Sequence, residues 1–129
     1  MFIIIDSSML MLPAEKKINL SYEFERLLPI SFKIVVPEAV LDELKLLIKR
    51  GKPSIKQKAN LAIQLSKKYQ TLESKTRIEV DLEIERLAIE HEAIVATNDS
   101  ELRLRLRKKG ISVIAMYGKN KLELFGDLI

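Results

Sequence analysis

The sequence contains no cysteine and no tryptophan, and His91 is its single histidine. Without cysteine, a disulfide scaffold, thiol catalysis and thiolate-bound metals are excluded. A single histidine also excludes a zinc site that is built from several imidazoles. No apolar run approaches the roughly 18 residues of a membrane-spanning helix. The apolar residues 2–5 meet Asp6 at once and are too short for a signal sequence, so we expect a cytoplasmic protein.

What the sequence does contain is the composition of a globular protein with an aliphatic core. Hydrophobic residues make up 47% and aromatic residues only 5% of its 129 positions. This length suits one ordinary domain, and we expect a single domain over residues 1–129. Lysine and arginine number 22 against 18 aspartates and glutamates, which gives a net charge of +4. The excess favours, though only weakly, a polyanionic partner such as nucleic acid or an acidic protein.

Strand-like and helix-like segments alternate along the chain. Short apolar runs predict strands at 2–5, 32–36, 70–73, 93–97 and 111–116. Helical spacing of apolar residues predicts helices at 18–28, 37–50, 55–68 and 79–91, and the tail after 116 has no clear pattern. Segment 101–107 alternates like a strand, but we assign it to a helix because Asn98 and Glu101 have the spacing of a capping box. The alternation of elements predicts a parallel sheet covered on both faces by helices.

Two aspartates follow strands of the predicted sheet. Asp6 comes directly after the strand at 2–5, and Asp99 comes shortly after the strand at 93–97. In open parallel α/β sheets, ligands bind beyond the carboxyl ends of the strands, where both aspartates would lie. Each aspartate also has a simpler explanation, since Asp6 can cap the next helix and Asp99 falls in a first helical turn, where acids are favoured.

A third acid, Glu43, lies on the apolar side of its predicted helix. On a helical wheel of 37–50 it falls inside the apolar arc around Val40, whereas Asp42 lies on the opposite face with Lys45. A carboxylate on the buried side of a helix is costly unless a counter-charge compensates it. We therefore expect Glu43 to have a partner, either a buried arginine or a cation, and Asp42 to point to solvent.

A fourth acid, Asp81, borders the apolar stripe of the helix at 79–91, although it could serve only as a favourable charge in the first turn. His91, near the same stripe, fits packing better than metal binding. Two carboxylates about 4 Å apart repel by about 4 kcal/mol at an effective dielectric of about 20, so four of them need a counter-charge. Hard divalent cations such as Mg²⁺ or Mn²⁺ are the usual solution. With a basic chain and no cysteine nucleophile, the pattern suggests metal-assisted phosphodiester hydrolysis.

Four segments carry a resemblance to a known family. They are Asp6-Ser7-Ser8 after an isoleucine-rich strand, Val36-Pro37 leading to Leu41-Asp42-Glu43-Leu44, Asp81 with Ile84 and Ala88, and Ala96-Thr97-Asn98-Asp99-Ser100-Glu101-Leu102. In this order they resemble the PIN-domain ribonucleases over nearly the whole chain, and the last segment is the most specific. The chain is most similar to small archaeal PIN proteins, which resemble both VapC-type toxins and the PIN domains of ribosomal-RNA processing factors.

The resemblance implies a three-layer α/β/α fold with a central parallel sheet and an acidic pocket that binds Mg²⁺ or Mn²⁺. It also implies cleavage of single-stranded RNA, an antitoxin protein or a ribosomal precursor as partner, and a homodimer as one plausible assembly. By position, the catalytic and metal-binding acids of the family correspond to Asp6, Glu43, Asp81 and Asp99. Its supporting polar residues correspond to Ser7, Ser8, Thr97 and Asn98.

One departure from the family pattern concerns the residue after Asp81. Many archaeal relatives carry two adjacent acids there, whereas this chain has Leu82, and Glu83 and Glu85 are the nearest acids that could substitute. A missing carboxylate would weaken metal binding more than it would change the fold. The sequence thus supports a metal-dependent endoribonuclease and, as an alternative, a catalytically weak or inactive PIN-like module that binds RNA or protein. A phosphoacceptor receiver domain would need an aspartate at the end of its third strand, and none lies at 70–73.

Basic residues gather in two segments, one leading into the turn at Gly51 and one following Asp99. Our candidates for holding RNA phosphates are Lys45, Lys49, Arg50, Arg103 and Arg107. Such groups could hold RNA phosphates near the acidic pocket, although a solvated helix face is the simpler explanation for any single lysine.

Overall fold

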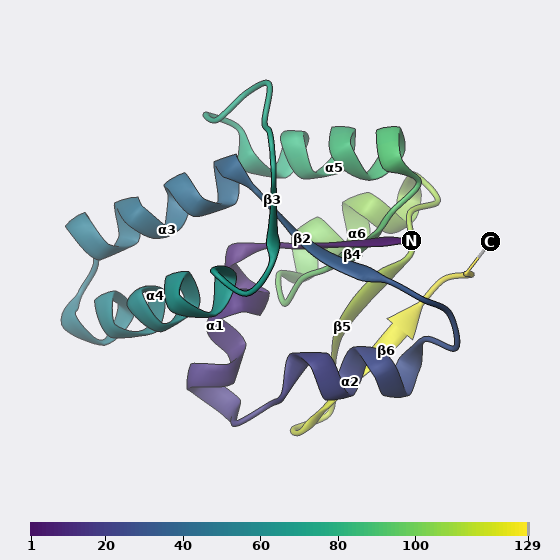
Figure 1. Cartoon of the computed structure of the whole chain (residues 1–129), viewed down its shortest axis with the longest axis horizontal. Helices are drawn as coiled ribbons and strands as arrows, with labels where there is room; N and C mark the ends of the chain where they lie inside the picture. The colour runs from purple at the N-terminus through teal and green to yellow at the C-terminus, as the bar shows by residue number, and fades with distance from the viewer. Residues whose placement is uncertain (129) are drawn as a thin grey trace.

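A six-stranded sheet in the order β3-β2-β1-β4-β5-β6 forms the centre of the protein. The structure is a computed structural model that describes residues 1–128 (Figure 1). The strands are β1 (Phe2–Ile5), β2 (Lys33–Pro37), β3 (Gln70–Leu72), β4 (Ile94–Ala96), β5 (Val113–Tyr117) and β6 (Lys121–Phe125). Strands β1 to β5 pair in parallel, whereas β6 pairs antiparallel with β5. The predicted α/β fold is confirmed, with one correction: the sheet is not wholly parallel, because the unassigned tail forms β6.

Helices cover both faces of the sheet. They are α1 (Ser7–Lys16), α2 (Leu20–Leu27), α3 (Glu38–Arg50), α4 (Pro53–Ser66), α5 (Val80–His91) and α6 (Ser100–Lys108). Helices α1 and α2 lie on one side of the sheet and α5 and α6 on the other, which gives the predicted three layers (Figure 1). Helices α3 and α4 form a hairpin that projects beyond the carboxyl ends of the strands, and α1 packs against α4. Within residues 1–128, no helix is long and apolar enough to cross a membrane.

Two helix starts differ from the prediction, because polar side chains determine them rather than apolar spacing. The apolar pattern does not predict α1, which begins where Asp6 accepts a hydrogen bond from the Met9 amide at 2.9 Å and which continues through Pro13. Helix α6 is present as predicted, but Asp99 caps it by accepting hydrogen bonds from two amides of its first turn. The predicted capping box starting at Asn98 is therefore wrong by one residue.

The core is centred on β1, which has a neighbouring strand on each side. Ile3, Ile4 and Ile5 are fully buried, and Ile4 is in register with Val35 of β2 and Val95 of β4. A strand that is covered on both faces favours apolar, β-branched residues throughout, which explains the isoleucine run. Asp6 directly follows β1, so it lies at the end of a strand that is paired on both edges and covered on both faces.

The outer edge of β6 is covered by α2. The Leu122 amide donates a hydrogen bond to Glu23 Oε1 at 2.8 Å, and Arg26 Nη2 donates one to the Leu122 carbonyl at 2.7 Å. Glu23 and Arg26 also form an ion pair at 3.1 Å. These side chains satisfy the amide and the carbonyl of Leu122, which a further strand would otherwise bind, and so they oppose pairing of this edge with another chain.

Candidate active site

The carboxyl ends of β1 and β4 meet at the centre of the sheet. Ile5 is in register with Ala96, and the Asp6 amide donates a hydrogen bond to the Ala96 carbonyl at 3.2 Å. From these ends the chain enters α1 on one side of the sheet and α6 on the other (Figure 1). Such a reversal opens a crevice at the sheet edge, where α/β folds bind their ligands. Asp6 and Asp99 both lie at this crevice.

Asp6 is buried, and both of its carboxylate oxygens accept hydrogen bonds. Its Oδ1 accepts from Ser8 Oγ at 2.8 Å and from the Met9 amide at 2.9 Å, and its Oδ2 accepts from Thr97 Oγ1. Burial raises the pKa of Asp6 to about 6; the hydrogen bonds oppose this rise, and the charge of Glu43 adds to it. Among residues 1–128, no lysine or arginine forms an ion pair with Asp6. Its charge thus has hydrogen-bond donors but no counter-charge.

Two hydroxyl groups connect Asp6 to the loop after β4. Ser8 Oγ, which donates to Asp6, accepts a hydrogen bond from the Asn98 amide at 2.9 Å. Thr97 Oγ1, which also donates to Asp6, accepts one from the Asp99 amide at 3.0 Å. Ser8 and Thr97 therefore hold Asp6 in one orientation relative to the loop that carries Asp99. Asn98 takes part through its backbone rather than its side chain.

Glu43 reaches the site from α3. Ser7 Oγ donates a hydrogen bond to Glu43 Oε1, so Ser7 contacts this acid rather than Asp6. The neighbouring Asp42 forms an ion pair with Arg77 at 3.3 Å, and its side chain is 38% exposed. The two adjacent acids thus lie on different faces of α3, as the helical wheel predicts. The partner of Glu43 is a serine hydroxyl and not a buried arginine, and within residues 1–128 no lysine or arginine forms an ion pair with it.

Glu43 and Asp81 line the same hollow, which has a volume of about 360 Å³ and lies between α3, α5 and α6. Its lining consists of Glu43, Ile78, Glu79, Val80, Asp81, Leu82 and Arg105. Partial burial raises the pKa of Asp81, the charge of Asp99 adds to the rise, and the charge of Arg105 opposes it. Asp81 and Asp99 are therefore close enough to repel each other.

The four predicted acids lie near one another but do not form a tight cluster of metal ligands. Glu43 acts on Asp6, and Asp99 acts on Asp81. In the part of the chain that the structure describes, no group of three or more Asp, Glu, His or Cys side chains is placed to hold a metal ion. The donor chemistry nevertheless suits Mg²⁺ or Mn²⁺, because these ions prefer oxygen ligands and the carboxylates lack a counter-charge.

Neither acid after Leu82 supplies the carboxylate that this position lacks. Glu83 is fully buried, and its Oε1 accepts a hydrogen bond from Arg86 Nε at 2.7 Å. Glu85 Oε1 forms an ion pair with Arg105 Nε at 3.1 Å. Leu82 is 41% exposed and lines the hollow beside Asp81. Both nearby glutamates are therefore engaged with arginines, and the lining of the hollow is apolar at Leu82.

The first group of predicted RNA-binding residues is available at the surface. Lys45, Lys49 and Arg50 are exposed on α3. Lys45 and Lys49 line a shallow groove with Asp42, on the side of the helix that faces away from Ser7. These cations can contact RNA outside the acidic hollow, but they do not line it.

The second group of predicted RNA-binding residues is partly used by the fold. Arg103 lies over the ring of Phe125, 4.8 Å from its centroid, and lines a second hollow of about 200 Å³ with Asp99. Arg107 Nη1 donates a hydrogen bond to the Ile111 carbonyl at 3.0 Å. Arg103 is therefore placed near an acid of the site, whereas the guanidinium of Arg107 supports the turn that leads to β5.

Arg105 lines the acidic hollow; it belongs to the basic segment that follows Asp99 but is not among the five candidates chosen from the sequence. The leucines of its segment alternate with arginines, and this alternation conceals which arginine faces the site. In the helix, Leu102 and Leu106 are buried, and Arg105 flanks them on the side of α5, where it meets Glu85. The predicted helix at 101–107 was enough to place Arg105 next to the buried leucines. Its partner on α5, Glu85, could be found only from the tertiary structure.

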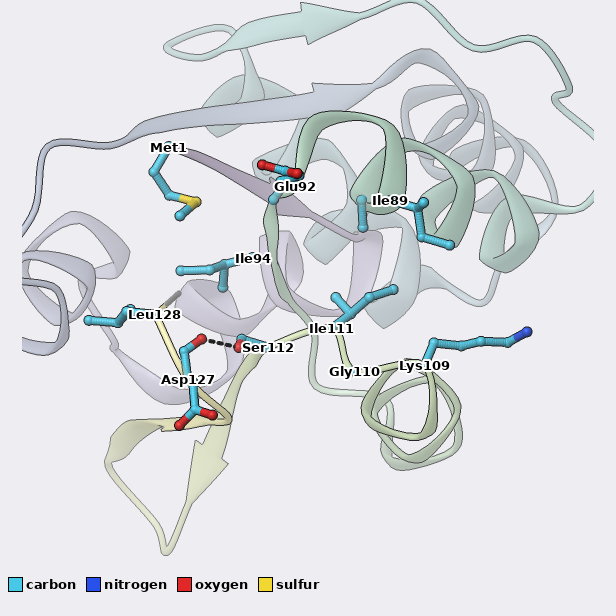
Figure 2. A pocket seen from close by; sticks show the side chains of 12 residues that line it. Met1, Ile89, Glu92, Ile94, Lys109, Gly110, Ile111, Ser112, Asp127 and Leu128 are labelled. Atoms are coloured by element: carbon cyan, nitrogen blue, oxygen red, sulfur yellow. Dashed lines mark hydrogen bonds between the residues drawn. The ribbon is translucent and has the colours of Figure 1, made fainter.

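Another hollow, of about 530 Å³, lies at the opposite edge of the sheet (Figure 2). Met1, Ile94 and Ser112 line it at the amino ends of β1, β4 and β5. Ser112 Oγ donates a hydrogen bond to the Asp127 carbonyl there. None of the four predicted acids lines this hollow. We therefore place the candidate active site at the carboxyl edge of the sheet.

The stability of the metal-free protein should depend on pH through Asp6. The folded pKa of about 6 lies above the ordinary value of 3.8, so the fold favours the protonated form. This contribution is present below about pH 4 and is lost as the pH rises through about 6, a change of about 3 kcal/mol in the free energy of unfolding. Asp6→Asn should lack this part of the pH dependence. Urea unfolding at a series of pH values, with chelator present, measures it, and parallel curves for both proteins would contradict the assignment.

Comparisons with known proteins agree with one another. The sequence model of a family described as PIN like domain matches residues 3–119. Over 127 residues the chain is 36% identical to the protein named Ribonuclease VapC4 of Methanocaldococcus jannaschii, and the match covers 96% of each protein.

Two solved structures share the fold. The PIN domain endonuclease Utp24 superposes with a TM-score of 0.80 at 23% identity, covering 99% of this chain and 95% of that one. A domain of a functionally unknown protein from Methanocaldococcus jannaschii superposes with a TM-score of 0.69 at 17% identity, covering 99% and 97%. At these identities, the two structures support the architecture and not the chemistry.

Proposed function

This chain belongs to the PIN-like domain family, and from that premise we propose that residues 1–129 form a single-domain endoribonuclease. The proposed reaction is the Mg²⁺- or Mn²⁺-dependent hydrolysis of phosphodiester bonds in single-stranded RNA. Nuclease activity is supported by the 36% identical relative, which is named a ribonuclease and matches over 96% of both proteins. The proposal of Mg²⁺ or Mn²⁺ as the metal and of single-stranded RNA as the substrate rests on the chemistry of the acidic site and on the family resemblance.

The observation that carries the proposal is the approach of four carboxylates from separate segments at one edge of the sheet. Asp6 is buried near Glu43, and Asp81 is near Asp99. Burial and a neighbouring carboxylate raise the pKa of Asp6 and of Asp81, so each of these two acids opposes folding when it is charged. A fold that retains such an arrangement supports a function for it, and the binding of a cation is the simplest one.

The proposed metal ligands are Asp6, Glu43, Asp81 and Asp99. A divalent ion, when bound, supplies a water of lowered pKa and stabilises the charge that develops on the phosphate. Ser8 and Thr97 hold the Asp6 carboxylate in place through hydrogen bonds, and Ser7 does the same for Glu43. These serine and threonine residues act on the orientation of the acids and do not need to touch the RNA.

Two biological roles fit this activity. One is a toxin that an antitoxin protein holds inactive, and the other is the processing of a ribosomal precursor. The exposed cations of α3, Lys45, Lys49 and Arg50, support contact with RNA phosphates in either role. Identification of the protein or RNA that co-purifies with the chain from its own cells would separate the two roles, and its mass in solution would test for a homodimer.

A second candidate function is a PIN-like module that binds RNA or protein and cuts weakly or not at all. The observation that favours it is Leu82, together with the engagement of Glu83 and Glu85 by arginines. With one carboxylate fewer, the site would bind a divalent ion more weakly, because affinity for these ions follows the number of charged ligands.

The variant Leu82→Asp should distinguish the two functions. It adds a carboxylate to the hollow beside Asp81, and the Mn²⁺ concentration for half-maximal cleavage should fall by roughly tenfold. Leu82→Asn is the matched control, because it has nearly the same shape as the aspartate without the charge. Cleavage of an end-labelled single-stranded RNA is measured against Mn²⁺ concentration, with chelator as the zero point. If the wild type and Leu82→Asp both bind RNA but neither cleaves it at any Mn²⁺ concentration, the result would support the binding module instead.

A further inference from the structure

One cation lies among the carboxylates of the hollow between α3, α5 and α6. The carboxylate residues in the lining are Glu43, Glu79 and Asp81, and Arg105 is the single lysine or arginine there. Burial raises the pKa of Asp81, and the charge of Arg105 opposes the rise, which shows that the guanidinium acts on this acid. Arg105 therefore belongs to the surroundings of the acids and not to the outer basic surface.

Arg105 is held through one side of its guanidinium. Its Nε donates a hydrogen bond to Glu85 Oε1 at 3.1 Å, and the side chains of Arg105 and Glu85 are 42% and 14% exposed. No other hydrogen bond from this guanidinium is present among residues 1–128. A guanidinium carries five N–H donors in a rigid fork, so the donors on its terminal nitrogens are open to a ligand. A partly exposed ion pair contributes little to stability. The ion pair of Arg105 on α6 with Glu85 on α5 is therefore not enough to explain why an arginine stands at this position.

A phosphodiester that approaches this site meets carboxylates that repel it. Arginine is suited to overcome this repulsion, because its planar fork binds two phosphate oxygens at once and its charge does not titrate. The guanidinium lines the same hollow as Asp81 and Glu43, so a phosphate held by it would lie beside the acids and not on the outer face of α3. The geometry thus provides one anion-binding group at the rim of an otherwise acidic site.

We propose that Arg105 is the phosphate-binding residue of the site, which holds an RNA phosphate next to the one that is cut, with Glu85 as its positioning residue. The choice of RNA as the ligand rests on the proposed nuclease function. The assignment differs from the exposed cations of α3, which would contact RNA outside the hollow. It predicts an effect on substrate binding rather than on the chemical step.

Steady-state cleavage of a short, unstructured, end-labelled single-stranded RNA at saturating Mn²⁺ tests the proposal. Arg105→Gln should raise KM by about tenfold while kcat changes by less than about threefold. The slope of log KM against log salt concentration should fall by about 0.7, the value for one lost phosphate contact to a single strand. Arg105→Lys should keep the salt slope but show an intermediate KM, because it retains the charge and loses the fork.

Two further variants test whether the effect comes from direct contact of Arg105 with the RNA. Glu85→Gln tests the positioning of the guanidinium, and Lys67→Gln tests the loss of one positive charge elsewhere on the protein. Glu85→Gln should raise KM less than Arg105→Gln does and leave the salt slope unchanged, because the guanidinium stays present but less ordered. Lys67→Gln removes an equal charge at the end of α4, where Lys67 contacts Gln64 and lines neither hollow near the acids, and its KM should equal that of the wild type. Thermal unfolding midpoints of all four variants should stay near the wild-type value, since the ion pair of Arg105 with Glu85 is partly exposed and Lys67 is exposed.

An unchanged KM and salt slope in Arg105→Gln would overturn the proposal. So would a lower unfolding midpoint together with a lower kcat at constant KM, because that result describes a structural residue. If the wild type cleaves no RNA, fluorescence anisotropy with the same RNA decides. Weaker binding by Arg105→Gln, with Lys67→Gln unchanged, would then support Arg105 while the nuclease proposal fails. Binding that does not depend on Arg105, or no binding at all, would overturn both.

Discussion

Substitution of Asp6 by asparagine should reduce metal-dependent RNA cleavage by at least about 100-fold while the fold stays intact. The substitution replaces a charged oxygen ligand with a neutral one of nearly the same shape. Asparagine can retain the hydrogen bonds of this position, because its carbonyl can accept from Ser8 and the Met9 amide and its amide can face Thr97 Oγ1. The loss of activity would therefore come from the missing charge and not from a collapsed site.

The same variant should be more stable than the wild type in the absence of metal at neutral pH. Charged Asp6 is buried close to Glu43 without a cation, and the asparagine relieves both the burial of charge and the repulsion. Metal should reverse this order, because a ligand of the folded state stabilises it by about 2.7 kcal/mol at a concentration of 100 times its Kd. Mn²⁺ should thus raise the midpoint of the wild type and raise that of Asp6→Asn less.

Thermal unfolding and cleavage assays, each with Mn²⁺ and with chelator, measure both effects. Asp42→Asn is the matched control, because it removes an equal charge near Glu43 from a side chain that pairs with Arg77 and does not line the hollow. The control should cleave RNA at the wild-type rate. A wild type without metal-dependent stability or cleavage, together with an Asp6→Asn variant that unfolds at a lower temperature, would identify Asp6 as a structural cap. The binding module would then replace the nuclease.

The second large effect is expected at Glu83, where the substitution Glu83→Gln should destabilise the protein by about 2–3 kcal/mol. Glu83 is fully buried, accepts hydrogen bonds from Arg86 Nε at 2.7 Å and Nη2 at 2.9 Å, and accepts one from the Lys75 amide at 2.6 Å. In a glutamine an NH₂ group replaces one of these two oxygens, so a donor would face a donor of Arg86 or Lys75, and the negative charge that pairs with the guanidinium is lost. For a chain of this size the thermal midpoint should fall by roughly 10 °C.

A control for Glu83 is available on the same arginine. Glu90 Oε2 contacts Arg86 Nη1 at 3.2 Å, but its side chain is 51% exposed, and Glu90→Gln should change stability by less than about 0.5 kcal/mol. The Arg86 hydrogen bonds lower the pKa of Glu83, with burial opposing them. The stability they provide is present above about pH 4.5 and is lost as the pH falls through the lower folded value. The difference between wild type and Glu83→Gln should therefore narrow in acid, and equal losses at Glu83 and Glu90 would contradict this account.

The buried β1 strand and the position of the acids could be predicted because they depend on local pattern. A run of isoleucines can be buried only where both faces are covered, so β1 had to be central, and Asp6 had to follow it at the carboxyl edge. Helical periodicity was enough to separate Glu43 from Asp42, since a turn of 100° per residue puts neighbours on different faces. The roles of these acids in metal binding stay predictions.

Elements without a strong apolar pattern could not be predicted. Helix α1 buries only Met9, Leu10 and Leu12 and contains Pro13, so its start depends on the capping carboxylate. Strand β6 has one fully buried residue, Leu122, and exists because β5 pairs with it and α2 covers its edge. The stability of such elements comes from tertiary contacts, which a local pattern does not contain.

The sequence by itself determined the alternation of the five parallel strands with helices, the aliphatic core and the position of Asp6 after the central strand, because these follow from periodicity and from the direction of parallel strands. Only the tertiary structure decided which charges meet. It pairs Glu83 with Arg86 in the core, Glu85 with Arg105 across α5 and α6, and Ser7 with Glu43. Within residues 1–128 it also leaves the four acids without a group of three side chains that is already placed to hold a metal ion. The physical reason is that ion pairs and hydrogen bonds act over a few ångströms between side chains whose spacing along the chain carries no information about their distance in space.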